Sequence, residues 1–168
     1  MKEYSYTITL ELSDEIYDTF MNLLDKKDSI NYKEVTINDK FEIKLMNRID
    51  QNVIQDLSMG QSQIFTLAFI LSLAKLASKG RNEINFPLFM DTPFARLSRE
   101  NRNNLIKNIP SLTNQWILLL SDTEFTSNEK ELFEKYNQVG KLYLLNNYEG
   151  RTTIEAYNKL SELDLEGY

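Results

Sequence analysis

The sequence predicts an α/β fold in which a mainly parallel sheet is flanked by helices and preceded by an N-terminal antiparallel β-meander. After residue 57, short apolar runs that are typical of buried strands alternate with helical patterns, and this order builds a parallel sheet. Before residue 57, two strand patterns flank the turn residues Asn38-Asp39-Lys40 as a hairpin. The 168 residues, of which 42% are hydrophobic, suffice for one buried core.

The first part of the chain, residues 1–56, is expected to supply a strand, a helix and the hairpin. The stretch from Tyr4 to Leu12 alternates its side chains between two faces, as a half-buried strand does. Ser13 then has the place of a helix N-cap, ahead of apolar residues that share one helical face (Ile16, Phe20, Leu23 and Leu24). The two hairpin strands are expected at residues 34–37 and 41–46.

The longest apolar stretch, residues 61–79, is expected to form a central helix. Its apolar residues recur every three or four positions, and Gly80 has the place of a C-terminal cap. Ser58 and Gly60 then lie at the helix N-terminus, where unpaired N–H groups and the helix dipole attract anions. A hydroxyl and a glycine at that end are typical of a site that faces a phosphate, but the same residues also serve as an ordinary cap.

A second apolar run, residues 86–91, ends in a carboxylate and is followed by threonine and proline. Such a run predicts a buried strand, and open α/β sheets hold ligands and metals at the C-terminal ends of their strands. Asp91 is therefore a candidate Mg²⁺ ligand, with turn formation as the alternative role.

The remaining elements follow at regular intervals. A helix is expected at residues 99–108, between a Ser98 cap and Pro110. The other elements are a strand at 116–120, a helix from 127 through 136, strands at 141–146 and 152–157, and an acidic tail at 158–168 that is expected to fray.

Three of these segments resemble motifs of ABC-type ATPases. Leu57-Ser58-Met59-Gly60-Gln61 resembles the signature motif, residues 86–91 (FPLFMD) resemble Walker B, and Ala95-Arg96-Leu97-Ser98 resembles the D-loop. The segment FMDTPFARLS, together with Leu120-Ser121-Asp122-Thr123-Glu124, is most similar to SMC-like DNA-processing ATPases, especially the DndD-type ATPase of bacterial DNA phosphorothioation systems. The resemblance covers about residues 34–157.

This resemblance implies that residues 1–157 are the C-terminal lobe of an ATPase head, with all of the motifs in residues 57–157. It implies ATP and Mg²⁺ as cofactors and Asp91 as the metal ligand. It also implies two partners: an N-terminal half with a Walker A motif, on the same or a separate chain, and a second head in an ATP-dependent dimer. The nucleotide-binding residues that it implies are Ser58, Met59, Gly60, Gln61, Ala95, Arg96, Leu97 and Ser98.

Two features of the family are missing from the sequence. None of the five glycines belongs to a G-x-x-x-x-G-K-[ST] loop, so nothing in the chain is expected to cradle the β- and γ-phosphates of ATP. Most ABC-type ATPases have a Glu after the Walker B Asp and a His after the next strand, where this chain has Thr92 and Asp122. Because Thr92 is no base near neutral pH, Asp122 and Glu124 are the candidate catalytic carboxylates.

The net charge of −6 disfavours direct binding of duplex DNA, so any DNA contact is expected to be indirect. The absence of Cys and His excludes disulfides, thiolate zinc sites, Cys nucleophiles and a His base. No signal pattern is seen, and the apolar stretch at 64–77 is shorter than a membrane span, so a cytoplasmic protein is expected.

Three function classes fit these observations. The first is an SMC-like ATPase lobe that works in DNA processing, repair or defence, and that is inactive without a Walker A half. The second is a pseudo-ATPase lobe that clamps on nucleotide or a partner without efficient turnover. The third is a transporter nucleotide-binding half, which the missing Glu and His disfavour.

Overall fold

The structure is a computed structural model, and it describes residues 2–78, 87–136 and 139–163. The helices are α1 (Lys2–Leu23), α2 (Lys26–Ser29), α3 (Met59–Ser78), α4 (Arg99–Asn108) and α5 (Ser127–Tyr136), with 3-10 turns at Ile109–Ser111 and Leu160–Glu162. The strands form three pairs: β1 (Tyr32–Ile37) with β2 (Ile43–Asn47), β3 (Pro87–Asp91) with β4 (Gln115–Leu119), and β5 (Leu142–Tyr148) with β6 (Arg151–Tyr157).

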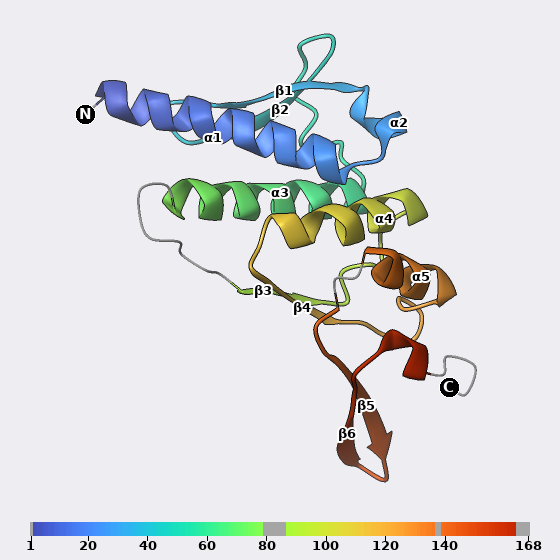
Figure 1. The fold of residues 1–168 in the computed structure, drawn as a ribbon. Coiled ribbons are helices and arrows are strands. Elements are labelled where there is room, and N and C mark those ends of the chain that lie inside the picture. The colour runs from blue at the N-terminus through green and yellow to red at the C-terminus, as the bar shows by residue number, and fades with distance from the viewer. Residues whose placement is uncertain (1, 79–86, 137–138, 164–168) are drawn as a thin grey trace.

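The elements stack in layers around α1 and α3 (Figure 1). The β1–β2 hairpin lies against α1, and α3 and α4 lie on the other side of that helix. The β3–β4 pair lies beneath α3 and α4, while the β5–β6 hairpin projects away from the rest of the chain. Since β3 and β4 are parallel, their C-terminal ends lie at one edge, below the start of α4.

The structure contradicts the predicted strand at Tyr4–Leu12 and the predicted cap at Ser13, because both lie within α1. The Ser13 hydroxyl donates to the Thr9 carbonyl oxygen at 2.8 Å, and the Thr9 hydroxyl donates to that of Tyr6 at 2.9 Å. These bonds satisfy hydroxyls that would otherwise be buried without partners. The buried face of α1 therefore keeps a helical spacing that includes two polar residues. Its buried positions are Thr9, Ser13, Ile16, Phe20 and Leu23.

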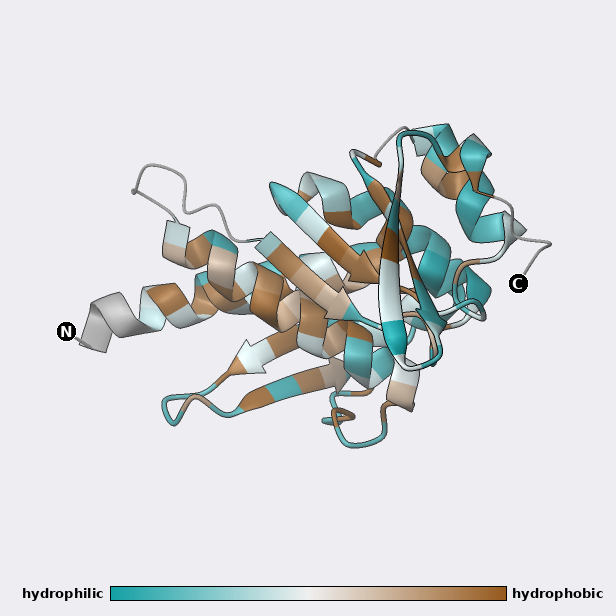
Figure 2. Cartoon of the chain, turned by 90° about the horizontal axis from the view of Figure 1, so that it is seen from below, coloured by the Kyte–Doolittle hydropathy of each residue, from teal (hydrophilic) through white to brown (hydrophobic). Residues whose placement is uncertain are grey.

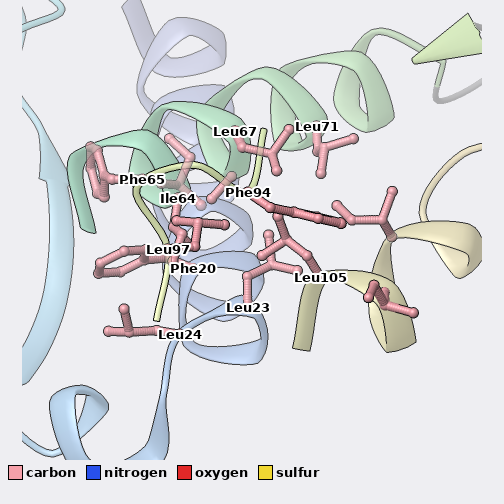
Figure 3. Packing of buried hydrophobic residues seen from close by; sticks show 14 of the residues in the cluster. Phe20, Leu23, Leu24, Ile64, Phe65, Leu67, Leu71, Phe94, Leu97 and Leu105 are labelled. Atoms are coloured by element: carbon pink, nitrogen blue, oxygen red, sulfur yellow. The ribbon is translucent and has the colours of Figure 1, made fainter. Parts of the chain in front are cut away.

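The core lies where α1, α3 and α4 meet. Phe20 of α1 packs edge-on against Phe65 of α3, with 5.2 Å between the ring centroids, and its ring lies 5.4 Å from that of Tyr32. Phe94, from the loop after β3, is fully buried among these helices, as Figure 3 shows. The buried Phe94 ring thus fixes the loop that carries the D-loop residues to the core.

The strand arrangement differs in two ways from the predicted sheet. The N-terminal antiparallel segment is the single hairpin β1–β2, because the third predicted strand is part of α1. Among the described residues, β3 and β4 are the only parallel pair, and the other two pairs are antiparallel. The fold is therefore a mixture of helices and small sheets, and the predicted larger parallel sheet is seen only as this pair.

Most other elements lie within a few residues of their predicted places. Ser98 caps α4 by accepting the N–H of Asn101 at 3.3 Å, and the chain then enters the 3-10 turn that contains Pro110. The tail does not fray at its start, because Leu163 is buried and its carbonyl oxygen accepts a hydrogen bond from Lys130 at 2.8 Å. The predicted Gly80 cap and the loop that follows it lie outside the described residues.

Helix α3 confirms the predicted central helix, although it starts at Met59, two residues earlier than predicted. Its 20 residues are long and apolar enough to cross a membrane by length and composition alone, which is weak evidence for a membrane segment. One face of the helix is buried in the core against α1 (Ile64, Phe65, Leu67, Ala68 and Leu71). This is how the core helix of a globular domain packs.

Candidate functional site

The signature residues form a capping box at the start of α3. The Ser58 hydroxyl oxygen accepts the N–H of Gln61 at 3.3 Å, and the Gln61 side-chain oxygen accepts the N–H of Ser58 at 3.0 Å. The predicted alternative role of Ser58 as a helix cap is therefore present. A hydroxyl that accepts one hydrogen bond can still donate its own hydrogen, and Ser58 and Met59 are exposed.

Gly60 brings the signature segment against the D-loop. It is buried, and a Cβ atom built on it would lie 2.6 Å from the carbonyl oxygen of Arg96. No side chain fits at that distance, so glycine lets the first turn of α3 touch the D-loop backbone. Two motifs that are about 35 residues apart in the sequence thus meet in the fold. Within the D-loop, Ala95 and Arg96 are exposed, while Leu97 is buried.

The end of β3 carries the candidate metal ligand, Asp91, at the surface of the chain. Asp91 is exposed and is the last residue of β3, opposite Leu119 in β4. The next residue, Thr92, has a φ of +44° and donates its N–H to the Leu119 carbonyl oxygen at 2.9 Å. A β-branched residue rarely adopts this φ, and such strain is often found at functional sites.

Asp91 fits a magnesium site only as one ligand among several. Within the ranges that the structure describes, no three Asp or Glu residues cluster closely enough to hold a metal ion by themselves. Mg²⁺ prefers oxygen ligands and is often held by one or two carboxylates, with phosphate oxygens and waters for the rest. An exposed carboxylate at the end of a strand suits that arrangement, in which nucleotide and a further protein segment complete the coordination.

The two candidate catalytic carboxylates have different surroundings. Asp122 is exposed, and one of its oxygens accepts the N–H of Thr123 at 2.8 Å. The Glu124 side chain is 1% exposed, and both of its oxygens are occupied. One accepts the N–H of Phe94 at 2.6 Å, and the other accepts the N–H and the hydroxyl of Ser121 at 3.2 and 3.1 Å.

Sequence reasoning missed Glu129, a buried carboxylate close to these residues. It is 2% exposed, accepts hydrogen bonds from the N–H and hydroxyl of Thr126, and lies 3.5 Å from Arg102 of α4. Burial by itself would raise the pKa of Glu129, but the hydrogen bonds from Thr126 and Asn128 favour the charged form and lower the pKa. The signal that could have revealed it is Thr126-Ser127-Asn128-Glu129, the pattern of a capping box.

The geometry brings the predicted residues into two adjoining groups. The signature residues contact the D-loop through Gly60, while Asp91 ends β3 and Asp122 follows the end of the neighbouring parallel strand β4. The loop that begins at Thr92 joins the two groups.

Searches with family models and among curated proteins find no match to this chain. Solved structures do match. One is an SMC ATPase from a study of ATP-driven dimerisation and DNA-stimulated activation, with a TM-score of 0.64 and 15% identity over 99% of this chain and 91% of that chain. Another is an SMC head bound to the C-terminal winged-helix domain of ScpA, with a TM-score of 0.63 and 16% identity over 94% of this chain.

A third match is an SMC head domain with an extended coiled coil, bound to the C-terminal domain of ScpA derived from Pyrococcus furiosus. Its TM-score is 0.50, with 13% identity over 88% of this chain. The chain spans 45% and 35% of the lengths of the two chains that were solved with ScpA. All three likenesses are in fold, at low sequence identity. This chain therefore has the fold of an SMC-like ATPase head region.

Proposed function

We propose that this chain is the C-terminal lobe of an SMC-like ATPase head, which binds and hydrolyses ATP between two heads once a Walker A half is joined to it. The observation that carries the proposal is the contact between the signature and D-loop segments, in which Gly60 leaves no room for a side chain next to Arg96. This contact sets the signature residues against the loop that follows β3. The likeness of the fold to SMC heads supports the same proposal.

Each exposed residue then has a distinct role. Ser58, with its N-terminal helix position, faces a phosphate that the opposing head holds, and Gln61 and the first N–H groups of α3 line the same surface. Asp91 binds Mg²⁺ in the site of its own head. When bound with ATP, Mg²⁺ neutralises the charge that develops on the phosphates.

For orienting the attacking water we favour Asp122 over Glu124. The Asp122 carboxylate is exposed and lies just beyond β4, so it has access to a bound nucleotide. The oxygens of Glu124 already accept hydrogen bonds from buried donors. A positioned carboxylate typically contributes a factor of about a hundred or more to the rate of a proton transfer.

The uncovered face of the β3–β4 pair supports a Walker A half as partner. Parallel sheets are normally covered on both faces, but alternate residues here are exposed although apolar: Phe89 at 59%, Ile117 at 37% and Leu119 at 38%. Figure 2 shows this side of the two strands, much of it hydrophobic. A second lobe that packs on this face would complete the sheet layer and supply the phosphate loop.

The proposed biological role rests on the segment from Asp91 to Ser98, which resembles DndD-type ATPases. On this basis we propose that the chain works in DNA processing in the cytoplasm, either in repair or in defence linked to DNA phosphorothioation. DNA contact through a partner is consistent with the net charge of −6. A pseudo-ATPase lobe is the second candidate, and Thr92 favours it, because its exposed side chain next to Asp91 supplies no carboxylate.

The test is to mix variants in the completed ATPase, with heterodimers purified through two different affinity tags. If Asp91 and Ser58 of one chain serve different sites, pairing an Asp91→Ala head with a Ser58→Arg head leaves one site intact. Placing both substitutions in one head, paired with a wild-type head, damages both sites. We expect about half of the wild-type ATP turnover from the first pairing and near-background turnover from the second. Equal turnover from the two pairings would refute the arrangement.

A further inference from the structure

A single peptide group in the D-loop segment is held from both sides by side chains of other elements. The carbonyl oxygen of Pro93 accepts a hydrogen bond from the Gln63 side-chain amide of α3 at 2.8 Å. The N–H of Phe94 donates to the Glu124 carboxylate at 2.6 Å. These two groups belong to the same peptide, the one that joins Pro93 to Phe94. We call this arrangement the peptide clamp, made of Gln63, the 93–94 peptide and Glu124.

The peptide clamp is buried at its centre and on the Glu124 side, while Gln63 is partly buried. Pro93 and Glu124 are among the fully buried side chains, and Phe94 is 0% exposed, with its ring inserted between the helices of the core (Figure 3). At the buried Glu124 side, water replaces a lost hydrogen bond poorly, so loss of the Phe94–Glu124 bond is costly. The second Glu124 oxygen extends the connection to the N–H and hydroxyl of Ser121.

We propose that Glu124 is a positioning residue that couples the loop after β4 to the signature helix through the peptide clamp. A displacement of the loop at residues 121–124 moves Glu124, Glu124 moves the 93–94 peptide, and that peptide moves Gln63 in the first turns of α3. The two ends of this path lie next to the groups assigned above to opposite nucleotide sites. The coupling of nucleotide sites rests on the proposed function, whereas the peptide clamp itself does not.

The chemistry of the clamp requires a carboxylate at position 124. Glu124 accepts hydrogen bonds from three donors with two oxygens, and it has no hydrogen to offer when charged. In Glu124→Gln one oxygen becomes an NH₂ group, which would face either the Phe94 N–H or the Ser121 N–H, donor against donor. In Gln63→Glu a carboxylate would instead face the Pro93 carbonyl oxygen, acceptor against acceptor.

The first test uses the 168-residue chain without nucleotide and measures amide hydrogen exchange by NMR. In Glu124→Gln we expect the Phe94 amide to exchange at least about tenfold faster, since its acceptor is lost or shared. The amides of Gln61 and Ser62 at the start of α3 should also exchange faster, because Gln63 no longer holds a fixed peptide. Glu131→Gln makes the same chemical change on an exposed side chain of α5 and should alter neither.

Two results would overturn the peptide clamp. One is an unchanged Phe94 amide in Glu124→Gln. The other is an equal acceleration at the Leu45 amide of the distant β1–β2 hairpin, which would mean that the substitution only lowers global stability. Acceleration confined to residues 121–124, with the start of α3 unchanged, would also contradict the coupling.

The second test measures turnover in the completed ATPase. If Glu124 acts through the clamp, Gln63→Ala and Glu124→Gln should each lower kcat by about tenfold or more with little change in the KM for ATP. The double variant should then be no worse than the poorer single one. If Glu124 instead orients water directly, Glu124→Gln abolishes turnover while Gln63→Ala leaves it intact. If the wild-type assembly itself hydrolyses no ATP, the proposed function fails, and the exchange experiment still decides the clamp.

Discussion

At the residue scale, Gly60 decides how closely the signature helix approaches the D-loop. The ideal Cβ position lies 2.6 Å from the backbone oxygen of Arg96, which is well inside the distance that real side chains tolerate. The obstructing atom is backbone rather than a flexible side-chain end. Any other residue would therefore force either α3 or the D-loop to move, and both carry residues of the proposed site.

We predict that Gly60→Ala lowers the free energy of unfolding by about 1–3 kcal/mol, the usual cost of overpacking. Gly140→Ala is the matched control, because nothing lies within 4 Å of a Cβ there. Urea denaturation of both variants and the wild-type chain measures the difference. A Gly60→Ala variant as stable as Gly140→Ala would show that the contact relaxes without cost.

A second residue-scale prediction concerns the pH dependence from Glu129. Its folded-state pKa is lowered, so its contribution to stability is present above the unfolded pKa and is lost as the pH falls through the folded pKa. Glu129→Gln should be less stable than wild type at neutral pH, and the gap should narrow as the pH falls below the ordinary Glu value of 4.5. Unfolding free energies across that range test this, with the exposed Glu131→Gln as control. A gap that widens in acid would contradict it.

At the element scale, asparagines on one face of α4 form hydrogen bonds with the backbone at the end of α1. Asn101 accepts the N–H of Asp25 at 2.7 Å, Asn104 donates to the Leu24 carbonyl oxygen at 2.9 Å, and Asn108 donates to that of Asn22 at 2.8 Å. The last carbonyl groups of a helix have no partner within the helix. These side chains supply part of what the end of α1 lacks.

We predict that Asn101→Ala lowers the free energy of unfolding by about 1–3 kcal/mol, because it leaves the partly buried N–H of Asp25 without its acceptor. Asn101 is 4% exposed, so water does not replace the lost oxygen. Lys107→Ala, on an exposed position of the same helix, should change stability by less than about 0.5 kcal/mol. Thermal unfolding of the two variants gives the comparison, and equal shifts in Tm would contradict the role of Asn101.

Local patterns in the sequence predict the elements better than the links between them. The periodicity of α3, the cap of α4 at Ser98 and the apolar run of β3 are all local signals, and the structure confirms these elements. The strand predicted at Tyr4–Leu12 was wrong. The apolar side chains alternate every second residue, as in a strand, but the segment is a helix whose buried face includes hydroxyl groups. A hydrophobicity pattern counts such hydroxyls as polar and exposed, although hydrogen bonds to the backbone allow them to be buried.

The contacts that shape the candidate site were not predictable in the same way. Gly60 meets Arg96, Gln63 meets Pro93, and Glu124 meets Phe94, each across about 30 residues or more of sequence. Such pairs depend on how whole elements pack, not on local spacing. Glu124 is the clearest case. A carboxylate in the loop after a strand is expected to be exposed, and only the fold shows that hydrogen-bond donors surround this one.

At the scale of the whole molecule, the uncovered face of the β3–β4 pair predicts where the Walker A half binds. We expect Phe89→Asp to weaken the association of the two halves by at least about tenfold, since it puts a charge into an apolar interface. Because Phe89 is 59% exposed, the lobe alone should keep its fold. Tyr148→Asp, at 72% exposure on the projecting hairpin, is the control and should bind as wild type does. Calorimetric titration measures both, and equal affinities would place the interface elsewhere.

If this chain joins a second head as proposed, the reciprocal hydrogen bonds between Ser58 and Gln61 also bear on how readily the two heads separate. When a phosphate oxygen takes the Gln61 N–H from the Ser58 hydroxyl, one acceptor replaces another and the number of hydrogen bonds is conserved. The exchange favours the phosphate, because an N–H bonds more strongly to a charged oxygen than to a neutral hydroxyl, and the capping box can form again when the anion leaves. If two heads join here as proposed, the junction is reversible, because the capping box would return the start of α3 to its unbound state.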